Sequence, residues 1–534
     1  MRTEECNVCT LLIKRSSGLF SNGAGTINRK NLKILRKLLC QDTTTFKWVW
    51  TKQSKCPIAY ERGRIYFDNY RSCFSCTTSV PGLLYEIPKC NRMEKIEDAL
   101  LCECPVGETL PRHSDYGASL IALTANNWLV RLSANTGEVL EKVYLSSDCK
   151  FRYVTWEAAQ ETVVVKSAHI KGPARSTQTG SQHSLLLYLA VFKVLPLSVV
   201  GMLEINKKIF GNTVTDATVS HGVLIIMHST GLVRLYSFQW IIHQFMEKEL
   251  NLRQECIWNF GNGIVGGYPF GIPCNIRITE SPPVLFEVSS LESALQIGGY
   301  PWHYIMTPNK KTEKGIYHIC ALKDNKVATN GIQDMQCCSL ESDWIYFHPD
   351  ESGRIVHVGP TQINVLKLTD LQNESGDCLV TEDFIIQARR EPKVNPLVTV
   401  TTSGRVVKTR FSQLDDDPEF ETFKNVDYED ELDLLATVKV TQAEMEGVAC
   451  LTFYNNQNGS LIKTLPLLES WDVTYSHGLF FDRDTIVHIE QKPNRIFCCY
   501  VYKMICGTPE EEKESKRSGR RSSLYCAKRS LDLK

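Results

Sequence analysis

Cysteine and histidine are the side chains that could bind a metal or act as nucleophile or base, and the chain holds 21 cysteines and 12 histidines. Two cysteine pairs, Cys6/Cys9 and Cys73/Cys76, have the CxxC spacing found in zinc sites. However, more than sixty residues separate the pairs, and a cysteine-rich chain produces such spacing by chance. We therefore predict no metal site and no cofactor.

The sequence contains no familiar catalytic signature. We find no GxSxG elbow, no P-loop and no HExxH motif. The histidines are scattered, and a single histidine in a turn, such as His221, is more typical of a structural hydrogen bond than of a catalytic base. We predict that the protein is not an enzyme and has no catalytic residue.

The elements that make up the chain are best seen in Asp216–Phe238. Val223–Met227 is an apolar run and Ser229-Thr230-Gly231 is a turn. In the run that follows, Leu232, Arg234, Tyr236 and Phe238 alternate with Val233, Leu235 and Ser237. Two such runs around a short turn containing Gly form a β-hairpin. We interpret this hairpin as the inner part of a propeller blade.

The same β texture continues from Phe46 to Cys506, with turn signals every 8 to 12 residues, roughly the spacing of an all-β domain. The strand-rich segments are Ile58–Tyr70, Ser119–Leu145, Arg152–Ala168, Ser184–Ile205, Asn275–Val288, Trp344–Leu368 and Leu397–Phe411. Radial repetition of small sheets removes long exposed edges. We therefore predict an all-β fold, a β-propeller of about seven blades.

Composition divides the chain into three parts: a flexible N-terminus (1–45), the propeller (46–506) and a disordered, charged tail (507–534). We expect inserts near 237–273, where a helical pattern precedes a Gly-rich loop, and near 415–435. The second insert is acidic, and we expect a solvated loop or a surface for basic partners.

A short amphipathic helix is predicted over 28–41. Four leucines share one face of it: Leu32, Leu35, Leu38 and Leu39. Lysines occupy the other face. The leucine face packs either on its own domain or in the groove of a partner.

Two apolar stretches raise the question of membrane insertion. Residues 184–205 are long enough to span a bilayer, and residues 222–240 are a weaker candidate. Lys193 near the middle of the first stretch is costly in a membrane, and Pro196 follows it. We interpret both stretches as core strands; the alternative is a two-span membrane protein.

Charge argues against nucleic acid as a partner, because 60 basic residues balance 60 acidic ones. A local basic run, Lys516–Arg521, lies in the tail. It predicts a nuclear or nucleolar location; the alternative is an inert disordered tail.

Several segments resemble a known family, the damage-specific DNA-binding-protein-one and cullin-four associated factors. They are Pro57–Arg71, Leu187–Asn212, Ser339–Gly359, Val426–Leu435 and Glu469–His477. The similarity extends from about Leu32 to Cys506. Members of this family are substrate receptors of cullin-RING ubiquitin ligases, and most are WD-type propellers.

The resemblance implies that the protein binds the ligase adaptor, damage-specific DNA-binding protein one, and through it the cullin. It also implies that the receptor recruits protein targets but catalyses no reaction itself. Family members often carry a WD-x-R signature, and Trp471-Asp472-Val473-Thr474 has Thr in place of Arg, while Tyr236–Gln239 has every key residue altered. The adaptor-docking candidates are the four leucines, Trp471 and Asp472. A propeller scaffold outside the ligase is the alternative.

Overall fold

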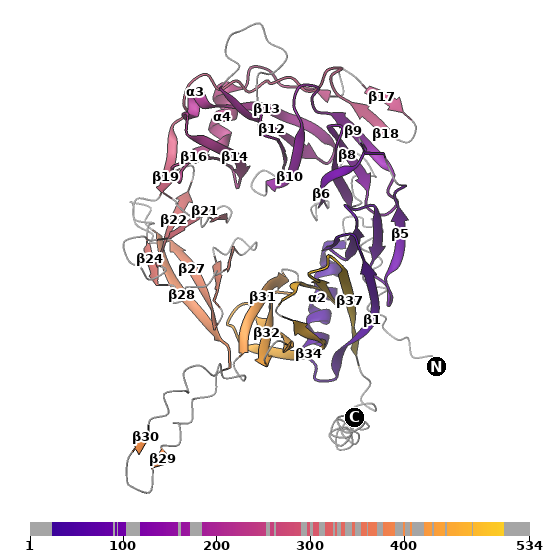
Figure 1. The fold of residues 1–534 in the computed structure, drawn as a ribbon. Coiled ribbons are helices and arrows are strands. Elements are labelled where there is room, and N and C mark those ends of the chain that lie inside the picture. Colours follow the sequence, from indigo (N-terminus) through magenta and orange to yellow (C-terminus); the bar gives the residue numbers. More distant parts are fainter. Residues whose placement is uncertain are drawn as a thin grey trace.

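The computed structural model of the protein describes residues 24–506 with internal gaps, the longest at 103–117, 171–183, 390–398 and 408–420. In the described part, small and mostly antiparallel sheets follow one another around a central opening (Figure 1). The predicted all-β propeller is confirmed.

Eight sheets of the described chain have four or more strands: six have four, one has five and one has six. This number is close to the roughly seven blades expected from the sequence. The first four sheets in chain order contain β2 (Ile58–Glu61), β3 (Arg64–Phe67), β4 (Ser72–Ser75) and β5 (Gly82–Glu86); β6 (Ile96–Cys102), β7 (Ser119–Thr124), β8 (Trp128–Ser133) and β9 (Val139–Tyr144); β10 (Phe151–Glu157), β11 (Thr162–Ser167), β12 (Leu185–Val194) and β13 (Leu197–Asn206); β14 (Val214–Ser220), β15 (Val223–His228), β16 (Leu232–Ser237) and β19 (Val284–Ser289).

The next three sheets contain β20 (Gln296–Gly298), β21 (His303–Pro308), β22 (Ile316–Lys323), β23 (Lys326–Val327) and β24 (Gln333–Gln336); β25 (Trp344–Phe347), β26 (Arg354–Val358), β27 (Gln362–Asp370) and β28 (Cys378–Gln387); β31 (Glu421–Glu429), β32 (Leu434–Ala443), β33 (Glu446–Asn455) and β34 (Leu461–Asp472). The last sheet contains β35 (Ser476–Asp482), β36 (Thr485–Gln491), β37 (Phe497–Cys506) and β1 (Thr44–Ser54).

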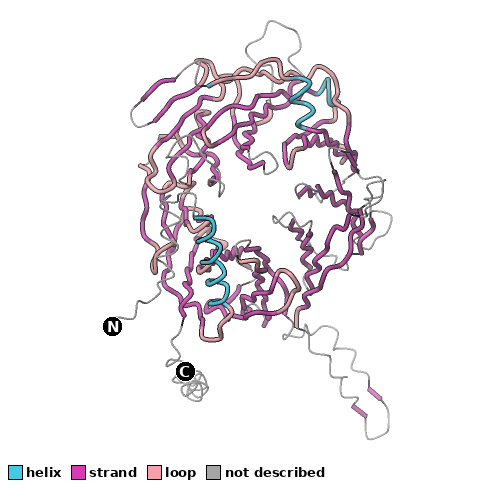
Figure 2. The backbone as a smooth tube through the Cα atoms, turned by 180° about the vertical axis from the view of Figure 1, so that it is seen from behind, coloured by secondary structure: helices cyan, strands magenta, loops and turns pink. Residues whose placement is uncertain are grey.

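The ring is closed by its two chain ends. β1 pairs antiparallel with β37, from Thr44 opposite Cys506 to Ser54 opposite Phe497. The first strand is therefore the outermost strand of the last blade, and unfolding either end opens the ring. Helix α2 (Ala24–Leu39) precedes β1 and lies alongside the closing blade, as the view from behind in Figure 2 shows.

The hairpin predicted in Asp216–Phe238 is present. Val223 lies opposite Ser237 in β15 and β16, and β14 adds a third strand. The tight turn before β15 places His221 and Gly222 at φ angles of 52° and 77°. This left-handed conformation suits Gly and is what a two-residue hairpin turn requires.

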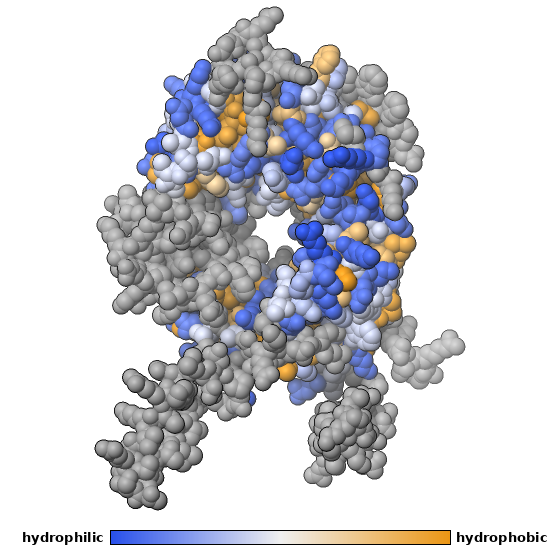
Figure 3. All heavy atoms as spheres, viewed as in Figure 1, coloured by the Kyte–Doolittle hydropathy of each residue, from blue (hydrophilic) through white to orange (hydrophobic). Residues whose placement is uncertain are grey.

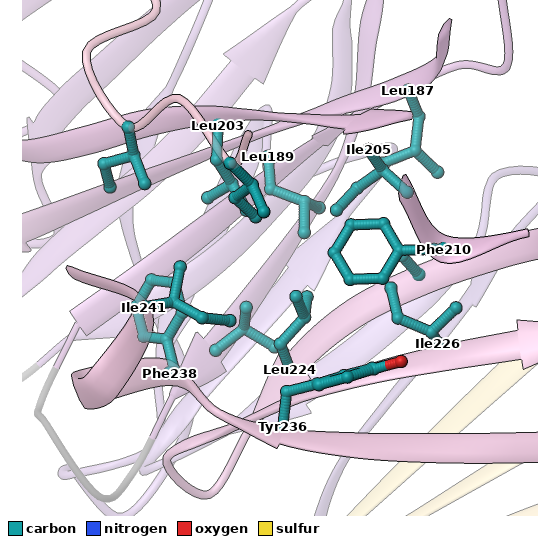
Figure 4. Packing of buried hydrophobic residues seen from close by; sticks show 14 of the residues in the cluster. Leu187, Leu189, Leu203, Ile205, Phe210, Leu224, Ile226, Tyr236, Phe238 and Ile241 are labelled. Atoms are coloured by element: carbon teal, nitrogen blue, oxygen red, sulfur yellow. The ribbon is translucent and has the colours of Figure 1, made fainter. Parts of the chain in front are cut away.

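The two apolar stretches are strands of adjacent blades. Leu187, Leu189 and Leu203 from β12 and β13 pack against Leu224 and Ile226 from β15, as Figure 4 shows. The alternative of two membrane-spanning segments is therefore wrong for these residues, because their side chains fill the seam between two sheets. No helix among the described residues has both the length and the apolar character needed to cross a bilayer.

Four local predictions need correction. The N-terminal helix begins at Ala24, inside the segment expected to be flexible, and the helix in the first insert is only α4 (Phe238–Phe245). The Gly-rich loop contains β18 (Gly263–Gly266), and the acidic insert contains β31. β31 is charged, yet it pairs with β32 along its length and buries Phe423 and Val426 on either side of a bulge.

The segment 397–411 is the fifth correction. Its strands, β29 (Thr399–Val400) and β30 (Val406–Val407), pair with each other in a separate two-stranded sheet and join no blade. The predicted tail, 507–534, lies outside the described residues.

The first insert runs back over two earlier blades before its own blade is completed. β17 (Ile257–Phe260) and β18 form a hairpin, and β18 extends the sheet of β9 in parallel. Isolated bridges then join Gly271 to Ser146 and Ile276 to Leu203. The insert thereby ties three neighbouring blades together at their outer strands.

Candidate interaction surfaces

Helix α2 packs on its own propeller through the leucine face. Leu35 is 5% exposed and Leu39 is fully buried, in a core cluster with residues of β32 to β36. Leu32 is partly buried against the same cluster, and Leu38 is half-buried. The simpler of our two interpretations of the leucine face is confirmed for Leu35 and Leu39, which the propeller itself covers.

Polar contacts fix the C-terminal end of α2. The Lys463 Nζ donates to the carbonyl oxygens of Gln41 at 2.6 Å and Leu39 at 3.4 Å, where a cation offsets the negative end of the helix dipole. The Thr44 hydroxyl donates to the Leu38 carbonyl at 2.6 Å. Burial lowers the pKa of Lys463, with nearby Asp42 acting in the opposite sense.

A further contact sets the rotation of α2. The Arg36 Nη1 lies 3.5 Å from the Asp433 Oδ2, in the turn between β31 and β32. Burial alone would raise the pKa of Asp433, but hydrogen bonds from Asn456 and Gln457 and the charge of Arg36 hold it below its usual value. The helix is thus held in one orientation relative to the blades below it.

The outward face of α2 carries an exposed apolar side chain between two exposed lysines. Ile34 is 50% exposed, and Lys33 and Lys37 lie on the same solvent-facing side. Burial of this exposed apolar side chain against a partner would be favourable, because it removes apolar surface from water. We call Lys33, Ile34 and Lys37 the outer face of α2.

The WD pair serves the fold at the end of β34. Trp471 is 4% exposed, and its ring stacks on those of His477 at 4.0 Å and His488 at 5.3 Å between centroids. The Asp472 Oδ1 accepts hydrogen bonds from the Thr474 backbone N–H at 2.8 Å and from its hydroxyl at 2.6 Å. These bonds lower the pKa of Asp472. The Asp472 carboxylate is therefore already hydrogen-bonded to Thr474 within a local turn.

Two histidines complete this turn. The His477 Nε2 lies 2.7 Å from the Asp472 carbonyl oxygen and donates to it, so that the His477 Nδ1 accepts from the His488 Nε2 at 3.0 Å. His488 is 1% exposed, and burial, assisted by His477, lowers its pKa to about 3. We call Trp471, Asp472, Thr474, His477 and His488 the WD turn.

The two sets of docking candidates lie at opposite ends of one strand. Lys463, near the start of β34, contacts the end of α2, whereas Trp471 and Asp472 end the strand eight residues later. At 3.3 Å per residue the separation is about 26 Å. One docking surface therefore cannot be assumed to contain both.

The altered motif at Tyr236–Gln239 is structural as well. Tyr236 and Phe238 are fully buried, and the Ser237 hydroxyl accepts a hydrogen bond from the Trp240 backbone N–H at 3.3 Å. Ser237 thereby caps the N-terminus of α4. None of these three side chains is available to a partner.

The cysteine pair within the described chain is buried. Burial raises the pKa of Cys73 and of Cys76 to about 12, which disfavours the thiolate that binds zinc. Over the described ranges, no group of three or more His, Cys, Asp or Glu side chains is placed to hold a metal ion. Cys6 and Cys9 lie outside the described residues.

The prediction from sequence missed a set of aspartates that join neighbouring blades at the centre of the ring. The Asp98 Oδ2 on β6 accepts from the Val154 backbone N–H on β10 at 2.7 Å. The Asp427 Oδ2 on β31 accepts from the Phe481 N–H on β35 at 3.2 Å. Burial raises the pKa of both carboxyl groups, while the backbone hydrogen bonds act in the opposite sense.

A sequence signal existed for Asp98, and Asp216 shares it. Ile96-Glu97-Asp98-Ala99 and Val214-Thr215-Asp216-Ala217 share the pattern of a β-branched residue, a polar residue, Asp and Ala. In both, the carboxylate accepts from the N–H of the following Ala, and the innermost strand has a bulge at Asp. The repeat marks the inner strand of a blade.

Comparison with known proteins gives one consistent result. The family model described as "DDB1- and CUL4-associated factor 17" matches residues 30–504. A protein of that name from Mus musculus is 64% identical over 97% of this chain and 100% of its own length. The Homo sapiens protein is 64% identical over 97% and 99%, and the Danio rerio protein 53% over 93% and 95%.

Proposed function

The chain belongs to the DDB1- and CUL4-associated factor 17 family, and from this premise we propose that it is a substrate receptor of a cullin-RING ubiquitin ligase. It binds DDB1, and through DDB1 a CUL4 cullin, and it holds target proteins beside the ubiquitin-transferring subunits. The family match over residues 30–504 carries the proposal. The closed ring is consistent with a rigid platform.

The receptor contributes position rather than chemistry. A target tethered to the ligase presents its lysines at an effective concentration that reaches about the millimolar range for a short linkage. Proximity of this kind converts an encounter between two molecules into a step within one complex. Transfer of ubiquitin then depends on how rigidly the receptor holds its target.

We assign DDB1 docking to the outer face of α2. Leu35 and Leu39 fix the helix on the propeller, and Ile34 and the flanking lysines remain exposed. The leucines predicted from the sequence thus act as anchors, and their neighbours make the contact. The WD turn is a weaker candidate because its polar groups already bond to one another.

Purification of the tagged full-length chain from cells tests the complex. We expect DDB1 and a CUL4 cullin to be recovered in amounts comparable to the chain. Recovery of the folded chain without DDB1 would contradict the proposal and favour a propeller scaffold outside the ligase.

Target recruitment needs a second experiment. Cells that lack the chain should accumulate proteins whose ubiquitylation returns when the wild-type chain is restored. The variant Lys33→Glu/Ile34→Asp/Lys37→Glu should not restore it, because it no longer docks. Equal rescue by this variant and the wild type would contradict the docking surface.

We also propose a nuclear location, on the basis of the basic run at Lys516–Arg521. These residues lie outside the described part of the structure. A fluorescent fusion of the full chain should enter the nucleus, and replacing the four basic residues of this run by Ala should reduce nuclear entry. An unchanged distribution of the fusion between nucleus and cytoplasm would contradict a role of this basic run in nuclear entry.

A further inference from the structure

The seam where the ring closes leaves apolar surface exposed at its outer rim. β1, the outermost strand of the last blade, lies next to the first blade, and the Trp50 ring on β1 is 5.5 Å from the Phe74 ring on β4 between centroids. Leu83 on β5 lies directly opposite Phe74 and is 57% exposed. Figure 3 shows apolar residues on the rim of the ring where Figure 1 labels β5. The two blades therefore do not bury their contact completely.

The strand register places two lysines on the same face of β1 as Trp50. Lys47, Trp50 and Lys52 pair with alternate residues of β37, which are Lys503, Val501 and Cys499. Alternate residues of a strand share one face. This face looks toward the first blade, because Val501 and Cys499 belong to a core cluster with residues of β3. Lys47 and Lys52 are exposed, and neither forms an ion pair with a described residue.

The same surface carries one acidic side chain. Glu86 at the end of β5 lies opposite Ser72, and Ser72 alternates with Phe74 on β4, so Glu86 is on the same face as Leu83. It is exposed and forms no ion pair with either lysine. One carboxylate against two ammonium groups leaves a net positive charge, which favours an acidic partner.

The two lysines define the spacing of the charges on such a partner. Their partners on β37, Lys503 and Cys499, are four residues apart, which is about 13 Å along a strand. An extended peptide with acidic residues four positions apart spans the same distance, and the residue midway between them points to the same side. On β1 the midway position is that of Trp50, beside Phe74 and the exposed Leu83. An apolar side chain is therefore favoured there.

We propose that this surface binds an extended segment of a target protein in which an apolar residue lies midway between two acidic residues four positions apart. We call it the seam surface; it is formed by Lys47, Trp50, Lys52, Phe74 and Leu83. The lysines pair with the two carboxylates, and the apolar residue covers Leu83 beside the two half-buried rings. The inference rests on the proposed receptor function and names the chemistry of the target.

The same residues disfavour two other partners. Pairing of the β1 edges of two copies of the chain would bring like-charged lysines together, and like charges on facing strands are destabilising. A nucleic acid carries a phosphate at every nucleotide, which Glu86 repels, and the exposed Leu83 offers no aromatic ring on which a base could stack. A peptide with two acidic residues places its charge at the lysines alone.

A library of random twelve-residue peptides displayed on phage tests the proposal with the full-length chain. We expect enrichment of peptides in which an apolar residue lies two positions from an Asp or Glu on either side. Leu83→Asp should reduce their binding at least tenfold, and Lys47→Glu/Lys52→Glu should select basic residues in place of acidic ones. Leu461→Asp, which changes a 61% exposed Leu on the outer strand of another blade, is the matched control and should bind as the wild type does.

Four results would overturn the inference: no enriched sequence, equal binding of the selected peptides by Leu83→Asp and the wild type, tighter binding of a single-stranded RNA of random sequence than of these peptides, or a dimer of the chain that Leu83→Asp dissociates. DDB1 binding is measured on the same preparations. A chain that binds DDB1 but selects no peptide contradicts only this inference, whereas a folded chain that does not bind DDB1 contradicts the proposed function.

Discussion

Helix α2 and the WD turn lie at opposite ends of β34, and each combines a buried apolar anchor with exposed polar residues. In the WD turn the polar groups bond to one another: Asp472 accepts from Thr474, and His477 bridges Asp472 and His488. On the outer face of α2, Ile34 stays half-exposed beside two lysines.

The comparison teaches that a motif known from a family is not by itself an available surface. Groups that satisfy one another within a turn must be separated before they can bind a partner, which costs the bonds they already make. An exposed apolar side chain on an anchored helix carries no such cost. We therefore expect changes in the WD turn to affect stability and changes on the outer face of α2 to affect binding.

The largest effect on stability is expected from Trp471→Ala. Removing a buried Trp leaves a cavity in the cluster below α2 and should lower the free energy of unfolding by about 3 to 5 kcal/mol. Ile34→Ala on α2 is the control and should change it little, since that side chain is half-exposed. Urea unfolding measures both. Similar free energies of unfolding for the two variants would contradict the expected difference between the WD turn and the outer face of α2.

Acid should also destabilise the WD turn. His488 has a pKa of about 3 in the folded chain because it is buried, whereas the unfolded chain titrates at the ordinary value of about 6.5. The unfolded state therefore binds more protons between these values, and stability falls as the pH drops from about 6.5 toward 3.

The variant His488→Phe should lose less stability over that interval than the wild type does. His243→Phe, at an exposed position of α4, is the control and should follow the wild-type curve. Unfolding midpoints in urea at a series of pH values give the comparison. Parallel curves for His488→Phe and the wild type would show that His488 does not cause the acid sensitivity.

A smaller loss is expected from Asp427→Ala on β31, the innermost strand of the blade that contains β34. This change leaves the N–H groups of Phe481 and Tyr428 without their acceptor and should cost about 1 to 3 kcal/mol. Asp427→Asn retains an acceptor oxygen and should cost less. The result would be contradicted if both variants unfolded at the wild-type urea concentration.

The smallest effect is expected from Asp472→Ala. The carboxylate is solvent-exposed, and its bonds to Thr474 compete with water, so the loss should be below that of Asp427→Ala. Thermal unfolding monitored by circular dichroism measures the difference. A loss larger than that of Asp427→Ala would mean that Asp472 supports more of the fold than its local turn.

Structural features that depend on residues close together in the chain could be predicted from the sequence. The turns at His221 and at Ser229-Thr230-Gly231 were recognisable because Gly222 and Gly231 favour a positive φ, and the strands on either side alternate apolar residues. The short β-rich runs expected from Phe46 onward include β1, which pairs with β37.

Contacts between distant residues were not predictable in this way. Nothing in 260–273 indicates that β18 adds to β9, more than a hundred residues earlier in the chain. The charge of 415–435 concealed β31, whose buried residues recur every third position rather than every second. The leucines of α2 were identified from the sequence. The sequence does not show whether the propeller itself or a partner protein covers them.

The most direct test of the account is the binding of purified DDB1 to two variants of the full-length chain, measured side by side by calorimetry. One is Lys33→Glu/Ile34→Asp/Lys37→Glu on the outer face of α2, and the other is Asp472→Ala/Thr474→Ala in the WD turn. We predict that the first loses at least tenfold in affinity while remaining folded, and that the second binds DDB1 as tightly as the wild type. The reverse pattern would contradict the account and place the adaptor at the WD turn.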